Sequence, residues 1–173
     1  MKKLALAGLI AASVSTPVLA EKANRVGLMF TQVEADISVY GLELTHAAQG
    51  WGLEYGRQLN RVFGINLSYD NTRFVDGYDI SNLKLGTDIG YEFQANETTV
   101  LKPYVEVGVN YASEFMGDND IYRDFNHYCG IGLRAEMTSF YIDVSKTSSW
   151  ITVANTPFDI NYPQYVVSAG FTF

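Results

Sequence analysis

The segment Tyr165-Val-Val-Ser-Ala-Gly-Phe-Thr-Phe173 decides the fold class of this sequence. Large apolar residues occupy one parity from Tyr165 to Phe173, while small and polar residues such as Ser168 and Thr172 occupy the other. Successive side chains of a β-strand point to opposite faces, so this alternation predicts a strand with one apolar face and one small, mostly polar face.

The same two-residue period recurs seven times upstream, which predicts eight strands in all. The upstream segments are 26–31, 51–56, 63–69, 83–93, 104–111, 128–137 and 140–145. After residue 20, no apolar run approaches the roughly 20 residues that a membrane-spanning helix needs. The chain is therefore predicted to be all-β.

The polar parity of these segments is rich in glycine and also carries charges. Glycine weakens an ordinary strand, but it suits places where space is tight. The interior of an eight-stranded barrel is such a place, because it is just wide enough for side chains to fill. We therefore expect a narrow, plugged lumen crossed by paired charges, which are Glu54, Lys84, Asp88, Glu106, Arg134, Glu136 and Asp143.

The apolar parity contains no charged residue within these segments. A Lys or Arg that faces lipid at the bilayer midplane costs roughly 2–4 kcal/mol, and far less near the interfaces. Arg57 and Lys146 fall just past strand ends, where headgroups are in reach. The pattern favours an eight-stranded antiparallel transmembrane β-barrel of the outer-membrane type over the alternative, a periplasmic β-sandwich.

Predicted connections alternate between long and short, as in a transmembrane barrel whose two mature termini are periplasmic and whose long loops are extracellular. Residues 36–45 also alternate and predict a hairpin that extends above the membrane, with two extra strands as the alternative. The long connections are 33–47, 70–80, 113–126 and 147–163, and the short ones are 58–61, 94–99 and 138–139.

Residues 1–20 have the pattern of a secretory signal peptide. Lys2 and Lys3 precede an apolar stretch, and Val18-Leu-Ala20 resembles a cleavage site. Cleavage there would leave residues 21–173 as the barrel, with 10 Lys and Arg against 19 Asp and Glu. This acidic balance argues against a nucleic-acid partner. The single Cys129 cannot form an internal disulfide.

The strands resemble the small eight-stranded outer-membrane β-barrel family typified by OmpX and Ail. The resemblance implies a Gram-negative outer-membrane protein whose loops meet lipopolysaccharide or host surface proteins, with roles in adhesion, defence or envelope integrity. Phe171 and Phe173 resemble the terminal signal that the outer-membrane assembly machinery reads. The motifs that carry the resemblance lie in segments 51–57, 86–93, 104–111, 128–134 and 167–173.

Apolar residues in the predicted long loops are candidates for a recognition surface. An alternative is that they pack on one another and stiffen the barrel mouth. The candidates are Phe115, Tyr122, Trp150, Ile151, Phe158 and Tyr162. The basic residues Arg73, Arg123 and Lys146 are candidate contacts for lipopolysaccharide phosphates, or else solvated loop charges.

Other functions have weaker support in the sequence. A lipid A-modifying enzyme is one weaker alternative. His127 and Cys129 share the lipid-facing parity, but the acids Glu136 and Asp143 fall on the lumen parity and could not orient a base outside the barrel, so no catalytic residues are predicted. A narrow pore, or lateral passage of small molecules, is the alternative function, although eight strands leave little bore. We expect no enzyme activity, no cofactor and no metal site.

Overall fold

The structure is a computed structural model that describes residues 24–39, 42–75, 77–117, 119–152 and 159–173. Residues 1–20, which the sequence predicts to be a signal peptide, lie outside the described residues. The strands are β1 (Asn24–Val39), β2 (Leu42–Gln58), β3 (Phe63–Val75), β4 (Tyr78–Gly90), β5 (Phe93–Gln94), β6 (Thr99–Met116), β7 (Asn119–Met137), β8 (Phe140–Thr152) and β9 (Asp159–Thr172).

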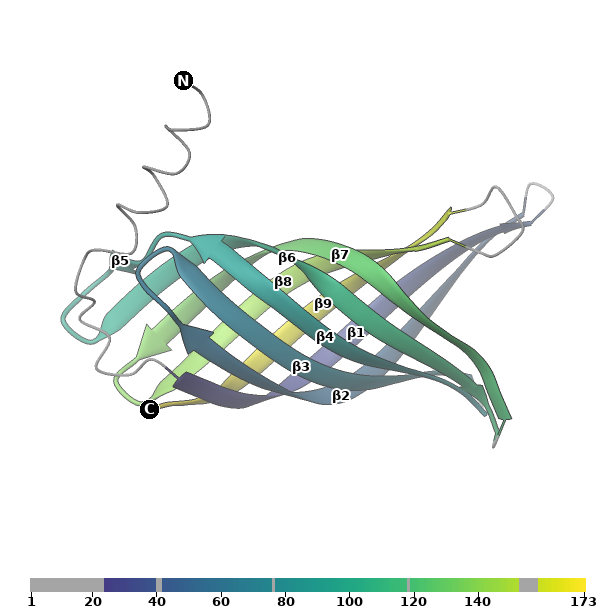
Figure 1. Ribbon diagram of the computed structural model, residues 1–173, viewed down its shortest axis with the longest axis horizontal. Coiled ribbons are helices and arrows are strands. Elements are labelled where there is room, and N and C mark those ends of the chain that lie inside the picture. The colour runs from purple at the N-terminus through teal and green to yellow at the C-terminus, as the bar shows by residue number, and fades with distance from the viewer. Residues whose placement is uncertain (1–23, 40–41, 76, 118, 153–158) are drawn as a thin grey trace, which may run out of the picture.

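The strands form one antiparallel sheet that closes on itself (Figure 1). Sequential neighbours pair, β1 pairs with β9, and pairing of β4 with β6 completes the ring. The two-residue strand β5 only adds to the start of β6. Eight long strands therefore make a closed barrel, which confirms the predicted fold class. No helix long and apolar enough to cross a membrane occurs among the described residues.

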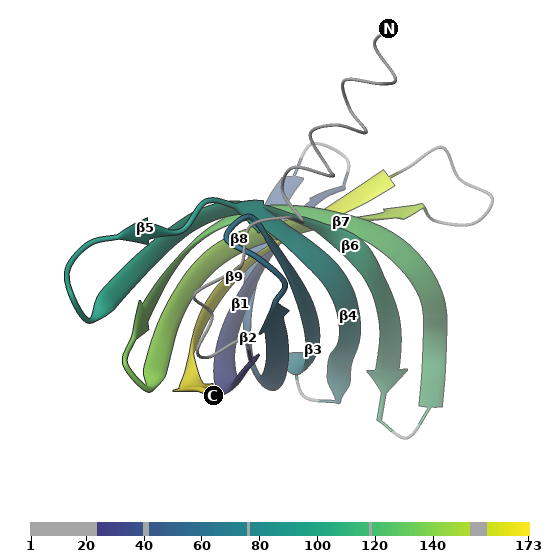
Figure 2. The same cartoon turned by 60° about the vertical axis from the view of Figure 1, so that its left-hand side comes forward.

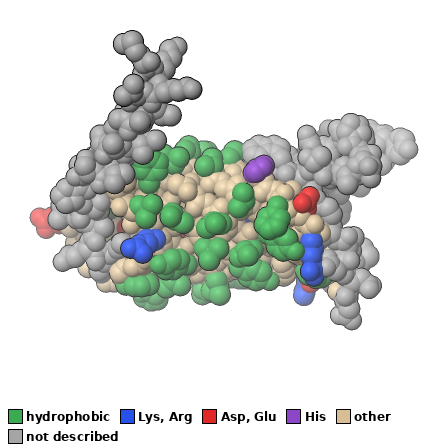
Figure 3. Space-filling model, viewed as in Figure 1, with side chains coloured by type: hydrophobic (Ala, Val, Ile, Leu, Met, Phe, Trp, Pro, Cys, Tyr) green, Lys and Arg blue, Asp and Glu red, His purple; other side chains and the backbone are tan. Residues whose placement is uncertain are grey.

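The barrel is apolar outside and polar inside, the reverse of a soluble domain. Outward residues such as Leu28, Trp51 and Ile131 are largely exposed, and Figure 3 shows hydrophobic side chains spread over the outer wall. Inward residues such as Asp88 and Arg134 are buried. Strand alternation produces this division, and an apolar outer band is what a lipid environment requires.

Three buried tyrosines pack inside the barrel because each lies directly opposite a glycine on the next strand. The register pairs Tyr104 with Gly132, Tyr128 with Gly108 and Tyr141 with Gly170. A Cβ atom at Gly132 would overlap the Tyr104 ring. The glycines of the polar parity therefore make room for aromatic rings that fill the lumen.

The barrel has two different ends, shown in Figures 1 and 2. Asn24 and Phe173 pair through their backbones at one, named here the terminal end. The β1–β2, β3–β4, β6–β7 and β8–β9 connections lie at the other, named here the hairpin end. Connections at the terminal end are short, as predicted between 58 and 61 and between 138 and 139.

The predicted long loops are mostly paired strand, and their predicted bounds were wrong. Pairing of β1 with β2 continues to Val39 and Leu42, so residues 36–45 form a hairpin and add no separate strands. Segments 70–80 and 113–126 are likewise largely β-structure. Their outward faces mix charged residues such as Arg73 and Arg123 with aromatic residues such as Phe125, so the apolar period is interrupted while the backbone ladder continues.

The hairpin end divides into separate projections, because neighbouring strands stop pairing at different heights. β3, β4, β6 and β7 stay paired almost to their turns and form a four-stranded tip (residues 71–80 and 111–126). Gly77 and Gly117 adopt positive φ angles of 81° and 61° in its two turns. The Gly117 amide donates to the Gly77 carbonyl at 2.6 Å, so the two turns are tied together.

Candidate functional site

The terminal half of the lumen is closed by cations gathered around Asp88. Its carboxylate is fully buried and accepts from Arg25 at 3.3 Å, from Arg134 at 3.4 Å and from Lys102. Arg134 also donates from Nε to Asp143 at 2.8 Å. Buried charges need partners of opposite sign, and these pairs provide them. The cluster fills the bore at this height.

Three carboxylates of the lumen accept hydrogen bonds from the buried tyrosines. Tyr104 donates to Asp143 at 2.8 Å, and Tyr128 donates to Glu106 at 2.8 Å. Tyr141 donates to Glu54, which also accepts from Ser168. Each of these carboxylates therefore accepts from a tyrosine hydroxyl, and each tyrosine lies opposite a glycine that leaves room for its ring.

Glu136 lies apart from these pairs, half-buried at the terminal end of β7. It is close enough to Glu92, in the turn after β4, to influence the ionisation of that residue. Burial raises the pKa of Glu92 above its usual range, and the Glu136 carboxylate adds to the rise. The remaining charge of the predicted lumen set, Lys84, lies in the hairpin half.

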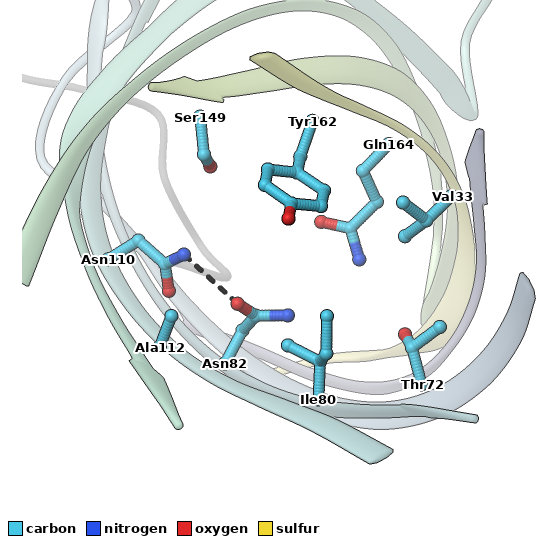
Figure 4. Close-up of a pocket in the computed structure, with 9 residues that line it drawn as sticks. All are labelled: Val33, Thr72, Ile80, Asn82, Asn110, Ala112, Ser149, Tyr162 and Gln164. Carbon is cyan, nitrogen blue, oxygen red and sulfur yellow. Dashed lines mark hydrogen bonds between the residues drawn. The ribbon is translucent and has the colours of Figure 1, made fainter. Parts of the chain in front are cut away.

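The hairpin half of the lumen is built mainly from neutral polar groups. Lys84 donates to Gln164, and Gln164 donates to Asp70 at 3.2 Å, so one amide links the two charges. Asn82 also donates to Asp70 at 3.0 Å, and it accepts from Asn110 at 3.0 Å. A small cavity opens above these residues (Figure 4).

Sequence analysis missed several of the residues that organise the lumen. Arg25 and Lys102, two of the three cations on Asp88, lie just outside the predicted strand segments. Asp70 was assigned to a loop. All three continue the inward parity of their strands, so extending the period by a few residues would have identified them.

The candidate recognition residues occupy three different environments. Phe115 on β6 is half-buried beneath Arg123 of β7, whose guanidinium carbon lies 6.0 Å from the ring centre. Tyr162 belongs to β9 and lines the internal cavity, so it does not lie on a loop surface. The others are Tyr122 on β7 and Trp150 and Ile151 on β8, whose side chains are not described, and Phe158, which lies outside the described residues.

The three basic candidates do not form one patch. Arg73 on β3 is exposed and donates to Asp79 on β4 at 2.9 Å. Arg123 is on β7, and two strands, β4 and β6, separate it from Arg73 on β3. Lys146 was predicted just past a strand end, but it lies within β8, where it is exposed and has Ile131 and Tyr165 as register partners, with Nζ 4.9 Å from the centre of the Tyr165 ring. Each would meet a phosphate separately.

The two residues considered for lipid A chemistry but not predicted to be catalytic lie on the outer wall. His127 and Cys129 are both exposed on β7, where register partners of Cys129 are Val107 and Ser148. Asp143 points inward and is bonded to Arg134 and Tyr104. Within the described ranges, no three His, Cys, Asp or Glu side chains are placed to hold a metal ion.

Several solved structures share this fold. Neisserial surface protein A matches with a TM-score of 0.59 and 14% identity over 87% of this chain and 97% of its own. The N-terminal barrel of Pseudomonas aeruginosa OprF matches at 0.58 and 16%, covering 88% and 98%. Ail of Yersinia pestis, an attachment invasion locus protein, matches at 0.51 and 18%, covering 88% and 99%.

At these identities the structural likeness concerns the fold alone, and no curated protein matches the chain by sequence. The family model described as the outer membrane protein beta-barrel domain matches residues 4–173. It therefore spans all eight strands. The chain belongs to this outer-membrane β-barrel family, and its fold is a small eight-stranded barrel similar to that of Ail.

Proposed function

We propose that this protein is a non-enzymatic surface barrel of the Gram-negative outer membrane, and that it binds host surface proteins through its four-stranded tip. In this proposal the hairpin end is extracellular and the mature termini are periplasmic. Removal of residues 1–20 as a signal peptide is part of the proposal. Adhesion is the favoured role, with defence or envelope interaction as related outcomes of the same surface.

The observation that carries this proposal is the way β7 extends beyond its pairing with β8. Pairing of β7 with β8 ends at His127 and Trp150, while pairing with β6 continues to Asn119. In the described part of the chain, residues 119–126 therefore pair with β6 and lie at the edge of the four-stranded tip. The edge of a sheet can accept an extended segment of another protein as an added strand.

Side chains beside this edge suit a protein partner. Phe125 is 72% exposed, and its ring lies 4.8 Å from that of Tyr111. Arg123 lies next along the outer face, above Phe115. Aromatic residues and arginine contribute disproportionately to binding energy at protein interfaces. Backbone pairing would supply affinity, and these side chains would supply specificity.

The closed lumen argues for this role over the pore alternative. Asp88 with its three cations occupies the terminal half, and the buried rings of Tyr104, Tyr128 and Tyr141 narrow the bore to a cavity of about 30 Å³. An ion would have to displace buried, mutually paired charges to pass. The outward position of His127 and Cys129, away from the inward carboxylates, argues equally against lipid A chemistry.

Two further contacts belong to the proposal. Lys146, exposed on β8, would meet a lipopolysaccharide phosphate, and Arg73 and Arg123 would do so separately on the tip. Phe171 and Phe173, outward-facing and exposed at the end of the chain, would form the signal for the assembly machinery.

The test is adhesion of cells that express a barrel with a shortened β6–β7 hairpin. Ser113 and Arg123 are register partners, so replacement of residues 114–122 by Asn-Gly would close the strands with a two-residue turn. The matched control replaces residues 36–45 by Asn-Gly between the partners Ala35 and His46. Binding to immobilised host matrix proteins is then compared at equal surface expression.

We expect the β6–β7 variant to fall to the level of cells without the protein, while the β1–β2 variant retains binding. Equal binding by wild type and the β6–β7 variant would overturn the proposed surface. Steady single-channel conductance from the purified wild-type barrel would contradict the closed lumen and favour the alternative function as a pore.

A further inference from the structure

A partly open cavity lies inside the mouth of the barrel, separate from the β7 edge. Its volume is about 30 Å³, with Asn82 and Asn110 on one wall and Gln164 on another. The Tyr162 ring extends into the space between Ser149 and Gln164 (Figure 4). The lining residues come from six strands, β1, β3, β4, β6, β8 and β9, so the site exists only when the barrel is closed.

One amide at the cavity has unused hydrogen-bonding capacity. Asn110 is only 2% exposed, and its Nδ2 atom donates to Asn82, while its Oδ1 atom has no partner among the described residues. Exchanging the oxygen and nitrogen of the Asn110 amide would place two acceptor oxygens together at Asn82, whose Nδ2 atom donates to Asp70, so hydrogen bonding favours the orientation with an unpartnered Oδ1. A buried polar atom without a partner costs about 1–3 kcal/mol. A ligand hydroxyl could satisfy this oxygen by donating to it.

The charges beneath the cavity are already engaged. Lys84 donates to Gln164 and lies 3.4 Å from the Thr147 hydroxyl. Asp70 accepts from Asn82 and Gln164. The cavity wall itself carries amides, hydroxyls and the apolar side chains of Val33, Ile80 and Ala112. This lining suits a neutral ligand that has hydroxyl groups on one side and C–H groups on the other.

We propose that the cavity binds the edge of a neutral sugar, such as the terminal unit of a surface glycan. A sugar ring offers hydroxyls to the Asn110 and Gln164 amides and an apolar C–H face to the Tyr162 ring. A volume of about 30 Å³ admits roughly one or two water-sized groups, so the ring enters by one edge and the rest projects from the mouth. This site does not depend on binding at the β7 edge.

The test is ligand-observed NMR of the full mature barrel in detergent micelles. Saturation transfer is measured to glucose, galactose and N-acetylglucosamine, and to the charged analogues glucosamine and glucuronate. We expect millimolar binding of at least one neutral sugar and weaker binding of both charged analogues. Preference for a charged analogue would overturn the assignment of a neutral sugar. No transfer to any neutral sugar would show that the cavity holds water only and would likewise overturn the proposal.

Variants locate the binding. Asn110→Leu removes the free amide, and Ala112→Leu fills the cavity from a position that makes no side-chain hydrogen bond. Asn110→Leu should weaken binding about fivefold, because a hydrogen bond contributes about 1 kcal/mol. Ala112→Leu should weaken binding at least as much, because its side chain occupies the space that the sugar would enter. The matched control is Asn71→Leu, which changes an outward-facing asparagine of β3. Binding that survives Ala112→Leu in a folded barrel, judged by circular dichroism, would place the sugar elsewhere.

Discussion

The two halves of the lumen use different chemistry in the same barrel. In the terminal half, Asp88 is surrounded by Arg25, Lys102 and Arg134, and a cavity of about 30 Å³ remains beside the rings of Tyr104 and Tyr128. In the hairpin half, hydroxyl and amide groups predominate around a cavity of the same volume. The difference between the two halves therefore concerns the charge of the lining. One layer is an ionic plug, and the other is mainly neutral and polar.

The largest expected effect comes from neutralising the centre of the plug. Asp88→Asn leaves three buried cations without their shared carboxylate, and breaking a buried ion pair in this way costs about 3–5 kcal/mol. Urea unfolding in lipid vesicles should show this loss. Asp79→Asn, which breaks only the exposed pair with Arg73, should cost about 1 kcal/mol or less. Equal losses would contradict the special role of the plug.

An intermediate effect is expected where a tyrosine packs on a glycine. Gly132→Ala places a methyl group in the Tyr104 ring, and overpacking of this kind costs about 1–3 kcal/mol. The cost should fall when the same change is made with Tyr104→Leu, because the ring is then absent. A double-mutant cycle measures this coupling. The same cost in both backgrounds would place the strain elsewhere.

The smallest effect is expected in the hairpin half. Thr31 and Thr72 share a buried hydrogen bond of 3.2 Å between their hydroxyls. Replacing both with valine should cost less than about 1 kcal/mol, because both partners are removed and no orphaned group is created by that bond. Unfolding measurements check this. A loss as large as that of Asp88→Asn would remove the distinction between the two halves.

Much of the lumen was predictable because parity is a local property. Arg134, Asp88, Asp143 and Glu106 were assigned inward from the alternation alone. Arg25 and Lys102 have the same parity but lie at strand ends, where no flanking apolar pattern marks the strand. Side-chain direction could therefore be predicted, while the choice of partner could not. Arg25 and Asp88 are 63 residues apart in the chain.

The hairpin end was predicted least well. Residues 113–126 were assigned to a loop because their outward side chains no longer alternate with apolar character. The ladder nonetheless continues, since backbone pairing does not need lipid-facing side chains. Tyr162 shows the same limitation. Its sequence position predicted an exposed aromatic residue, whereas the course of β9 turns it into the mouth cavity.

By itself, the sequence determined the number of strands, the antiparallel barrel and the face on which most side chains lie. These follow from a period of two residues, which is short enough to be apparent in a single segment. Only the tertiary structure decided that three cations meet at Asp88, that each tyrosine faces a glycine, and that β7 continues past the end of its pairing with β8. These features depend on register and closure, which join residues far apart in the chain.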